Sequence, residues 1–243
     1  MKKRTKIILA VCLALLLVID IGGWVYVADY YHADEQAVAA MAGESAAVRV
    51  EQRGDVTWFV PDSPAAGMIF YPGGKVEAAA YAPLLSACAE RGIVCALVQM
   101  PANLAVLDMD AADGLQQEFP AVTDWYIGGH SLGGAMAASY ASGHADEFAG
   151  LVLLAAYSTQ DLSASPLRVL SVYGSADGVL DREAYAENWP NLPADTVELV
   201  LDGGNHAQFG SYGAQDGDGA PAMPASEQLR QTADAISAFL EAH

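Results

Sequence analysis

The most informative part of this sequence for the fold is Trp125-Tyr126-Ile127-Gly128-Gly129-His130-Ser131-Leu132-Gly133-Gly134. It matches the pattern G-x-S-x-G, in which a serine occupies a sharp turn between a strand and a helix. Gly129 and Gly133 flank Ser131, and we expect a Cβ at either position to collide with the strand or the helix. Such a turn exposes the serine hydroxyl, which makes Ser131 a candidate nucleophile.

The neighbouring residues favour this interpretation. An apolar run at 125–127 is typical of a buried parallel strand, and apolar residues recur at helical spacing directly after Ser131. A glycine-rich turn without a catalytic role is the alternative, because the pattern alone is a weak signal.

Strands and helices alternate on both sides of this stretch. Before it, the pattern predicts a hairpin over 47–60, a strand at 67–71, a helix that stops at Gly92, a strand at 93–100 and a helix over 103–119. After it, the pattern predicts helices at 131–142, 182–189 and 226–241 and strands at 151–157, 167–173 and 196–201. This order indicates one α/β domain with a doubly wound, mostly parallel sheet. Only nine residues separate Tyr157 from Leu167, too few for a cap domain.

The N-terminal segment has a different character. Residues 7–27 form an apolar run interrupted only by Asp20, and as a helix they would span about 31 Å, the thickness of a bilayer core. We therefore expect a transmembrane signal anchor over 1–27, a linker over 28–45 and the α/β domain over 46–243. A cleaved signal peptide is the alternative, although no small-x-small site closes the apolar run.

Charges on either side of the run predict its orientation. The basic residues Lys2, Lys3, Arg4 and Lys6 precede it, and the acidic residues Asp29, Asp34 and Glu35 follow it. By the positive-inside rule the N-terminus stays in the cytoplasm, so we expect a single-pass protein of the cell membrane with its main domain outside the cytoplasm.

The remaining sequence is strongly acidic. Without residues 1–27, which hold four basic residues and Asp20, the chain has seven basic and 29 acidic residues, a net charge of −22. Such a domain repels polyanions, so nucleic acid is not expected as a partner. Cys88 and Cys95 are the only cysteines of this part, and we interpret them as small buried residues, with a disulfide as the alternative.

Three motifs resemble one known superfamily. They are Tyr-Pro-Gly-Gly-Lys-Val at 71–76, Gly-Gly-His-Ser-Leu-Gly-Gly at 128–134 and Gly-Gly-Asn-His-Ala-Gln-Phe-Gly at 203–210. Together they resemble the α/β-hydrolase superfamily over residues 46–243 and, more narrowly, a bacterial group of membrane-anchored α/β hydrolases. The resemblance implies the α/β-hydrolase fold and a catalytic order of nucleophile, acid and histidine.

The same order along the chain is found here in Ser131, Asp177 and His206. Each follows a predicted strand, and a doubly wound sheet gathers its catalytic groups at the carboxyl ends of its strands. His206 is also favoured by elimination, since His130 should point away from Ser131 and the other histidines are terminal or lie beyond the helix that follows Ser131. Asp181 and Asp202 remain alternatives to Asp177 as the acid.

The backbone near Ser131 supplies candidate donors for an oxyanion. The N–H of Leu132 follows the nucleophile, and the glycine-rich turn after the strand at 67–71 should supply the second N–H. Gly74 is the preferred donor there, and Lys75 is the alternative.

These residues predict a serine hydrolase that cleaves carboxylic esters through an acyl-enzyme, with small uncharged esters or lactones as substrates and with no cofactor or metal. An acyltransferase would use the same triad, and a non-catalytic binding module on the same scaffold is a further alternative. The oligomeric state is not predicted.

Overall fold

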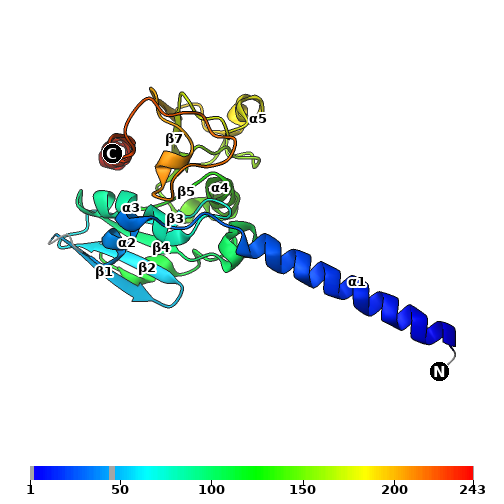
Figure 1. The fold of residues 1–243 in the computed structure, drawn as a ribbon. Coiled ribbons are helices and arrows are strands. Elements are labelled where there is room, and N and C mark those ends of the chain that lie inside the picture. Colours follow the sequence, from blue (N-terminus) through cyan, green and yellow to red (C-terminus); the bar gives the residue numbers. More distant parts are fainter. Residues whose placement is uncertain (1–2, 44–46, 243) are drawn as a thin grey trace. The chain divides into compact units, whose positions relative to one another are not determined.

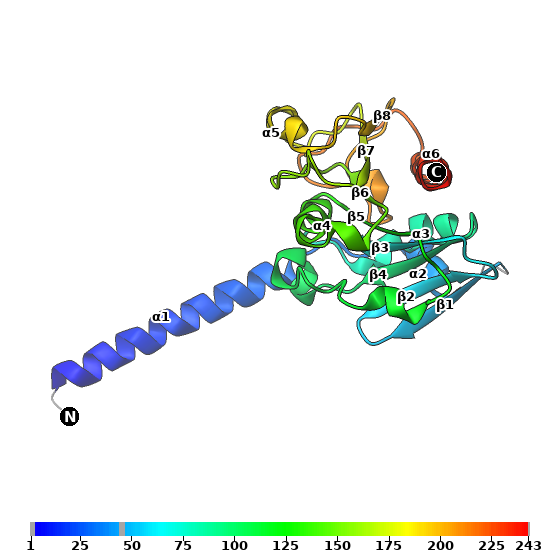
Figure 2. The ribbon, with the colours of Figure 1, turned by 180° about the vertical axis from the view of Figure 1, so that it is seen from behind.

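The computed structural model describes residues 3–43 and 47–242, so the predicted domain boundary at 45/46 lies outside the described residues. The chain divides into two units, residues 1–30 and residues 31–243. In the second unit an eight-stranded sheet has the strand order β1-β2-β4-β3-β5-β6-β7-β8, whose members are labelled in Figures 1 and 2. The strands are β1 (Val48–Arg53), β2 (Val56–Pro61), β3 (Ala66–Tyr71), β4 (Ile93–Val98), β5 (Trp125–His130), β6 (Gly150–Leu154), β7 (Arg168–Gly174) and β8 (Val197–Leu201).

The sheet is mostly parallel, as the sequence predicted. Strand β2 pairs antiparallel with β1 and β4, and the pairs from β4 through β3 to β8 are parallel. Every residue of β3, β4 and β5 is buried, which explains why these strands read as continuous apolar runs.

The strand order reverses beside β3, and this reversal determines where a ligand site is expected. The chain goes from β3 to β4 on one side and then returns to β5 on the other side of β3, with Tyr71 in register with Gly129. The loops that follow β3 and β5 therefore begin at the same edge of the sheet and lead to opposite sides. Doubly wound sheets bind their ligands in the crevice between such loops.

Helices cover both faces of the sheet. One face packs α2 (Glu35–Met41), α3 (Ala82–Ala89) and α6 (Ala225–Glu241), and the other packs α4 (Leu132–Gly143). Strand β6 shows the alternation directly, because Val152 and Leu154 belong to the first core and Leu151 and Leu153 to the second. Seen from either side, α3 and α4 flank β3 on opposite faces (Figures 1 and 2).

The helix predicted over 103–119 is wrong. This segment forms three 3-10 turns, η2 (Pro101–Asn103), η3 (Ala105–Leu107) and η4 (Leu115–Glu118). Ala102, Asn103 and Gly114 have positive φ angles of 53°, 55° and 72°, which an α-helix does not accommodate. The buried Tyr71 hydroxyl holds the segment by accepting the Ala112 N–H at 3.0 Å and donating to the Met109 carbonyl at 2.7 Å.

Other connections also differ from, or add to, the predictions. The expected linker over 28–45 contains helix α2, capped by Asp34 and packed against α3. A short helix α5 (Arg182–Asn188) follows β7, and no helix or strand interrupts the described chain between β6 and β7.

Cys88 and Cys95 are buried and free, and burial raises the pKa of the Cys95 thiol well above its ordinary value.

The first unit consists mainly of helix α1 (Lys3–Ala28), so a helix at this position was predicted correctly. In the part of the chain that the structure describes, no helix combines the length and the apolarity needed to cross a membrane. The transmembrane anchor predicted from residues 7–27 is therefore not supported. The location outside the cytoplasm stays a prediction.

Two valines on neighbouring strands test how the core is arranged. Val172 on β7 is 0% exposed, whereas Val197 on β8 is 49% exposed. We expect Val172→Ala to lower the free energy of unfolding by about 2 to 3 kcal/mol, since it removes buried methyl groups and leaves a cavity. The matched control Val197→Ala should change it by less than about 0.5 kcal/mol. Equal losses in urea denaturation would contradict the assigned core.

Candidate active site

Ser131 lies at the apex of the turn between β5 and α4. Its backbone has φ 53° and ψ −124°, a strained conformation for a residue other than glycine. The Ser131 N–H donates to the Leu154 carbonyl at 2.9 Å, and its own carbonyl accepts the Ala135 N–H at 3.1 Å. These bonds tie the strained residue to β6 on one side and to the first turn of α4 on the other.

The glycines beside Ser131 allow this turn to approach β3. A Cβ at Gly129 would lie 2.5 Å from the Tyr71 carbonyl oxygen, and one at Gly133 would overlap the carbonyl oxygens of Tyr71 and Pro72. Both contacts are with backbone atoms, which cannot move aside as a flexible side chain can. The steric requirement is therefore the one expected from G-x-S-x-G.

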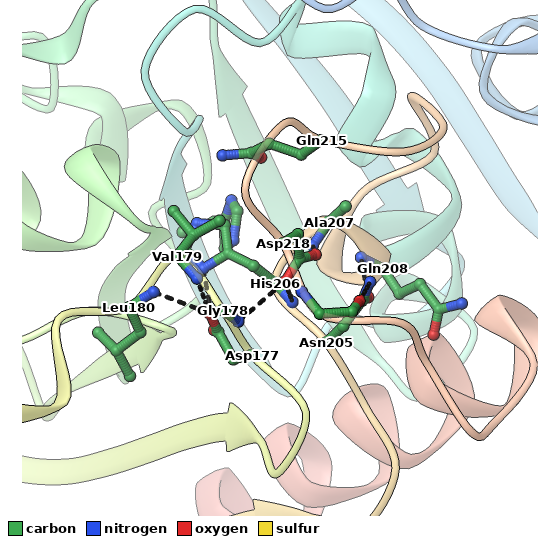
Figure 3. A network of polar contacts seen from close by, with 12 residues as sticks. Asp177, Gly178, Val179, Leu180, Asn205, His206, Ala207, Gln208, Gln215 and Asp218 are labelled. Carbon is green, nitrogen blue, oxygen red and sulfur yellow. Dashed lines mark hydrogen bonds and ion pairs between the residues drawn. The ribbon is translucent and has the colours of Figure 1, made fainter.

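Asp177 and His206 are hydrogen-bonded to each other. His206 Nδ1 lies 2.9 Å from Asp177 Oδ2, and the two side chains are 2% and 0% exposed (Figure 3). Asp177 Oδ1 accepts the N–H groups of Val179 at 2.9 Å and Leu180 at 2.8 Å. Burial acts to raise the pKa of Asp177, but the hydrogen bond and charge of His206 and these two N–H donors outweigh it and lower the pKa. The carboxylate therefore stays ionised at neutral pH.

The two alternative acids have other partners. Asp181 caps α5 by accepting the N–H groups of Glu183 and Ala184, and Asp202 accepts the Ser175 hydroxyl at 3.3 Å. Of the three acids considered, Asp177 is the one that the structure pairs with His206.

Ser131 and His206 line one cavity of about 340 Å³. His206 Nε2 is buried and has no hydrogen-bond partner among the described residues, so it is not bonded to the Ser131 hydroxyl. Hydrogen bonds of this kind often form only when substrate is bound. The rest of the lining is largely apolar and consists of Leu132, Ala135, Met136, Ala155, Ala156, Tyr157, Thr159, Val179, Leu180 and Asp181.

Leu132 and Gly74, the two residues expected to supply N–H groups to an oxyanion, are neighbours in the structure. Leu132 is the first residue of α4, so its N–H has no acceptor within the helix. A Cβ at Gly74 would lie 2.8 Å from the Leu132 side chain. The Lys75 N–H donates to the Asn103 carbonyl at 2.8 Å, whereas the Gly74 N–H has no acceptor among the described residues. The geometry therefore favours Gly74 over Lys75.

His130 packs beneath the candidate histidine, a contact that the sequence did not suggest. Its ring centroid lies 4.4 Å from that of His206, and its Nδ1 lies 2.7 Å from the Tyr81 hydroxyl. Burial, followed by the neighbouring His206, lowers the pKa of His130 well below its ordinary value, which keeps the ring neutral. A neutral His130 ring places no positive charge beside His206.

Sequence reasoning missed two residues that hold the loops of this site. The Tyr81 hydroxyl accepts the Gly73 N–H at 3.0 Å and so fixes the glycine-rich turn after β3. Asp218 accepts N–H groups from the segments that carry Asp177 and His206. In the sequence, Tyr81 looks like an ordinary core residue. The one feature that marks Asp218 is its position between Gly217 and Gly219, which indicates a turn.

Residues 67–230 match the model of the alpha/beta hydrolase family, and this match covers more than half of the chain. The chain belongs to the alpha/beta hydrolase family. It is therefore a hydrolase. The matched region contains β3 from Gly67 onward, strands β4 to β8 and the candidate site residues. The narrower resemblance to a membrane-anchored group stays a prediction.

Solved structures share the fold of this hydrolase at low sequence identity. TT1662 from Thermus thermophilus is 15% identical with a TM-score of 0.58, over 81% of this chain and 99% of the other. A thermostable esterase from Pseudomonas putida is 16% identical with a TM-score of 0.58, over 86% and 89%. Carboxyl esterase 2 from the fungus Tuber melanosporum is 13% identical with a TM-score of 0.57, over 82% and 90%. No curated protein matches the sequence.

Two glycines of α4 test the steric requirement at the turn. We expect Gly133→Ala to destabilise the hydrolase by more than about 3 kcal/mol or to prevent folding, because its Cβ would overlap two carbonyl oxygens of the β3 loop. The control Gly143→Ala places its Cβ in open space at the end of the same helix and should be neutral or slightly stabilising. Thermal unfolding of both variants measures the difference, and a neutral Gly133→Ala would refute the close approach.

Proposed function

We propose that this hydrolase cleaves carboxylic esters with Ser131 as nucleophile, His206 as general base and Asp177 as the acid that orients it. The observation that carries the proposal is the buried 2.9 Å hydrogen bond between Asp177 and His206, because His206 Nε2 is thereby left free beside Ser131 in one cavity. A carboxylate on Nδ1 holds the proton there, so Nε2 is the basic nitrogen. Two of the proteins that share the fold are named esterases, which is consistent with this reaction.

The proposed reaction has two steps. His206 Nε2 takes the hydroxyl proton as Ser131 Oγ attacks the ester carbonyl carbon, and the proton then leaves with the alcohol. Water, deprotonated by the same nitrogen, attacks the acyl-enzyme and releases the carboxylic acid and free Ser131. The N–H groups of Leu132 and Gly74 stabilise the oxyanion in both steps.

The cavity supports small substrates. Its volume of about 340 Å³ is near the lower end of the about 300 to 1,000 Å³ found for small-molecule sites. No helix or strand lies between β6 and β7 in the described chain, where a lid could supply a longer apolar wall. Asp181 lines the cavity and the domain is acidic, so anionic esters are disfavoured.

Active-site labelling tests the nucleophile. We expect a fluorophosphonate probe to label the wild type and Ser142→Ala, an exposed serine of the same helix, but not Ser131→Ala. His206→Ala should lower turnover by about 10⁴-fold or more, on the scale seen when a triad member is removed. The control His144→Ala should not, because His144 stacks on Tyr140 instead. Labelling that survives Ser131→Ala would overturn the assignment.

A p-nitrophenyl ester series tests the substrate. We expect kcat/KM to peak at about two to four acyl carbons, since an extended chain finds too little apolar surface to gain about 0.8 kcal/mol per methylene. A maximum at long chains would refute the small-ester proposal. Adding alcohol acceptors to the same assay separates a hydrolase from an acyltransferase, which would form a new ester in place of the free acid.

A further inference from the structure

Asp218 lies in the connection between β8 and α6 and accepts four backbone N–H groups. Its Oδ1 accepts Gly178 N–H at 3.1 Å, His206 N–H at 3.2 Å and Gly219 N–H at 2.8 Å, and its Oδ2 accepts Ala207 N–H at 2.9 Å. Hydrogen bonds to an ionised acceptor are stronger than neutral ones. One side chain thus organises the backbone of two separate segments.

The two segments are those that carry Asp177 and His206. Gly178 directly follows Asp177, and the Asp218 carboxylate bonds the N–H of His206 itself (Figure 3). The side chains of Asp177 and His206 are hydrogen-bonded at 2.9 Å, and the Ala176 N–H donates to the Gly204 carbonyl at 2.8 Å. Asp218 therefore adds a further bridge between two loops that already contact each other.

Close backbone packing supports this bridge. A Cβ at Gly178 would lie 2.7 Å from the Gly217 carbonyl oxygen, and one at Gly219 would overlap the Ala176 carbonyl oxygen. The loop around Asp218 therefore lies directly against the Asp177 turn.

The histidine side of the bridge is anchored to α6. The Asn205 N–H donates to Gln228 Oε1 at 3.0 Å, and Gln228 Nε2 donates back to the Asn205 carbonyl at 2.7 Å. Gln228 is 0% exposed. The loop that presents His206 is thus fixed from α6 on one side and by Asp218 on the other.

We propose that Asp218 is a positioning residue that sets the orientation of His206 relative to Asp177. This inference rests on the proposed function of that pair, because Asp218 acts through it and does not itself line the substrate cavity. Without the carboxylate, four N–H groups lose their acceptor. The two loops are then joined by the Asp177–His206 bond, by the Ala176 N–H that donates to the Gly204 carbonyl at 2.8 Å, and by packing. Displacements of about 1 Å in a catalytic group can cost about 10²-fold in rate.

Asp218→Asn is the sharpest variant, because it keeps the shape and changes one acceptor oxygen into a donor. The amide oxygen can replace only one of the two carboxylate oxygens, so the amide nitrogen must face at least one backbone N–H. Asp218→Ala removes both acceptors. Asp216→Asn and Asp216→Ala are matched controls, since Asp216 is exposed in the same loop.

The experiment measures kcat and KM with a short-chain p-nitrophenyl ester, thermal unfolding, and the downfield proton resonance of His206 Nδ1–H in the full chain. We expect Asp218→Ala to lower kcat by about 10²-fold and Asp218→Asn by at least about tenfold, with KM nearly unchanged. The Nδ1–H resonance should shift or broaden in both variants. The Asp216 controls should behave as wild type in every measurement.

Wild-type kcat and an unchanged resonance in Asp218→Asn would overturn the proposal, as would a loss expressed only in KM or only in stability. If Asp218→Ala does not fold, the nearly isosteric Asp218→Asn decides. If the wild type neither hydrolyses esters nor reacts at Ser131, the proposed function fails, and the resonance still reports whether Asp218 holds the pair.

Discussion

The contact between the end of β3 and the start of α4 is the constraint on which the site depends. The carbonyl oxygens of Tyr71 and Pro72 occupy the space that side chains at Gly129 and Gly133 would need. This close approach forces the backbone at Ser131 into a positive φ angle, and hydrogen bonds to β6 and α4 hold it there. The same contact brings the turn after β3 next to Leu132, so one steric feature sets the positions of both Ser131 and this turn.

Charge is the second constraint on the site, because the carboxylates of Asp177 and Asp218 both lie near His206. Asp177 and Asp218 accept hydrogen bonds mainly from backbone N–H groups, and within the described residues neither carboxylate is bonded to an arginine or a lysine. Backbone donors are fixed in direction and carry no net charge, so they stabilise the carboxylates without adding a cation that would compete with His206. The neutral His130 ring beneath His206 fits the same electrostatic scheme.

The sequence predicted the regular elements well where a period or a special residue carried the signal. The buried strands read as apolar runs, and the elbow read as a glycine-flanked serine. The segment 103–119 was mistaken for a helix because its apolar spacing was helical, whereas positive φ angles at Asn103 and Gly114 and the Tyr71 hydroxyl impose short turns. Spacing describes which residues face inward, but it does not reveal a backbone bent by distant partners.

The α/β class, the turn at Ser131 and the short set of residues able to act with Ser131 could be predicted from the sequence, because each follows from local spacing or from a glycine that a close backbone approach requires. The pairing of Asp177 with His206, the Gly74 N–H left without an acceptor among the described residues, and the bonds of Tyr81 and Asp218 to the loops became apparent in the folded chain. Those contacts and the bond between Tyr81 and His130 join segments up to 49 residues apart in the chain. Hydrogen bonds between such segments depend on how the loops meet at the edge of the sheet, and local sequence carries no signal of that meeting.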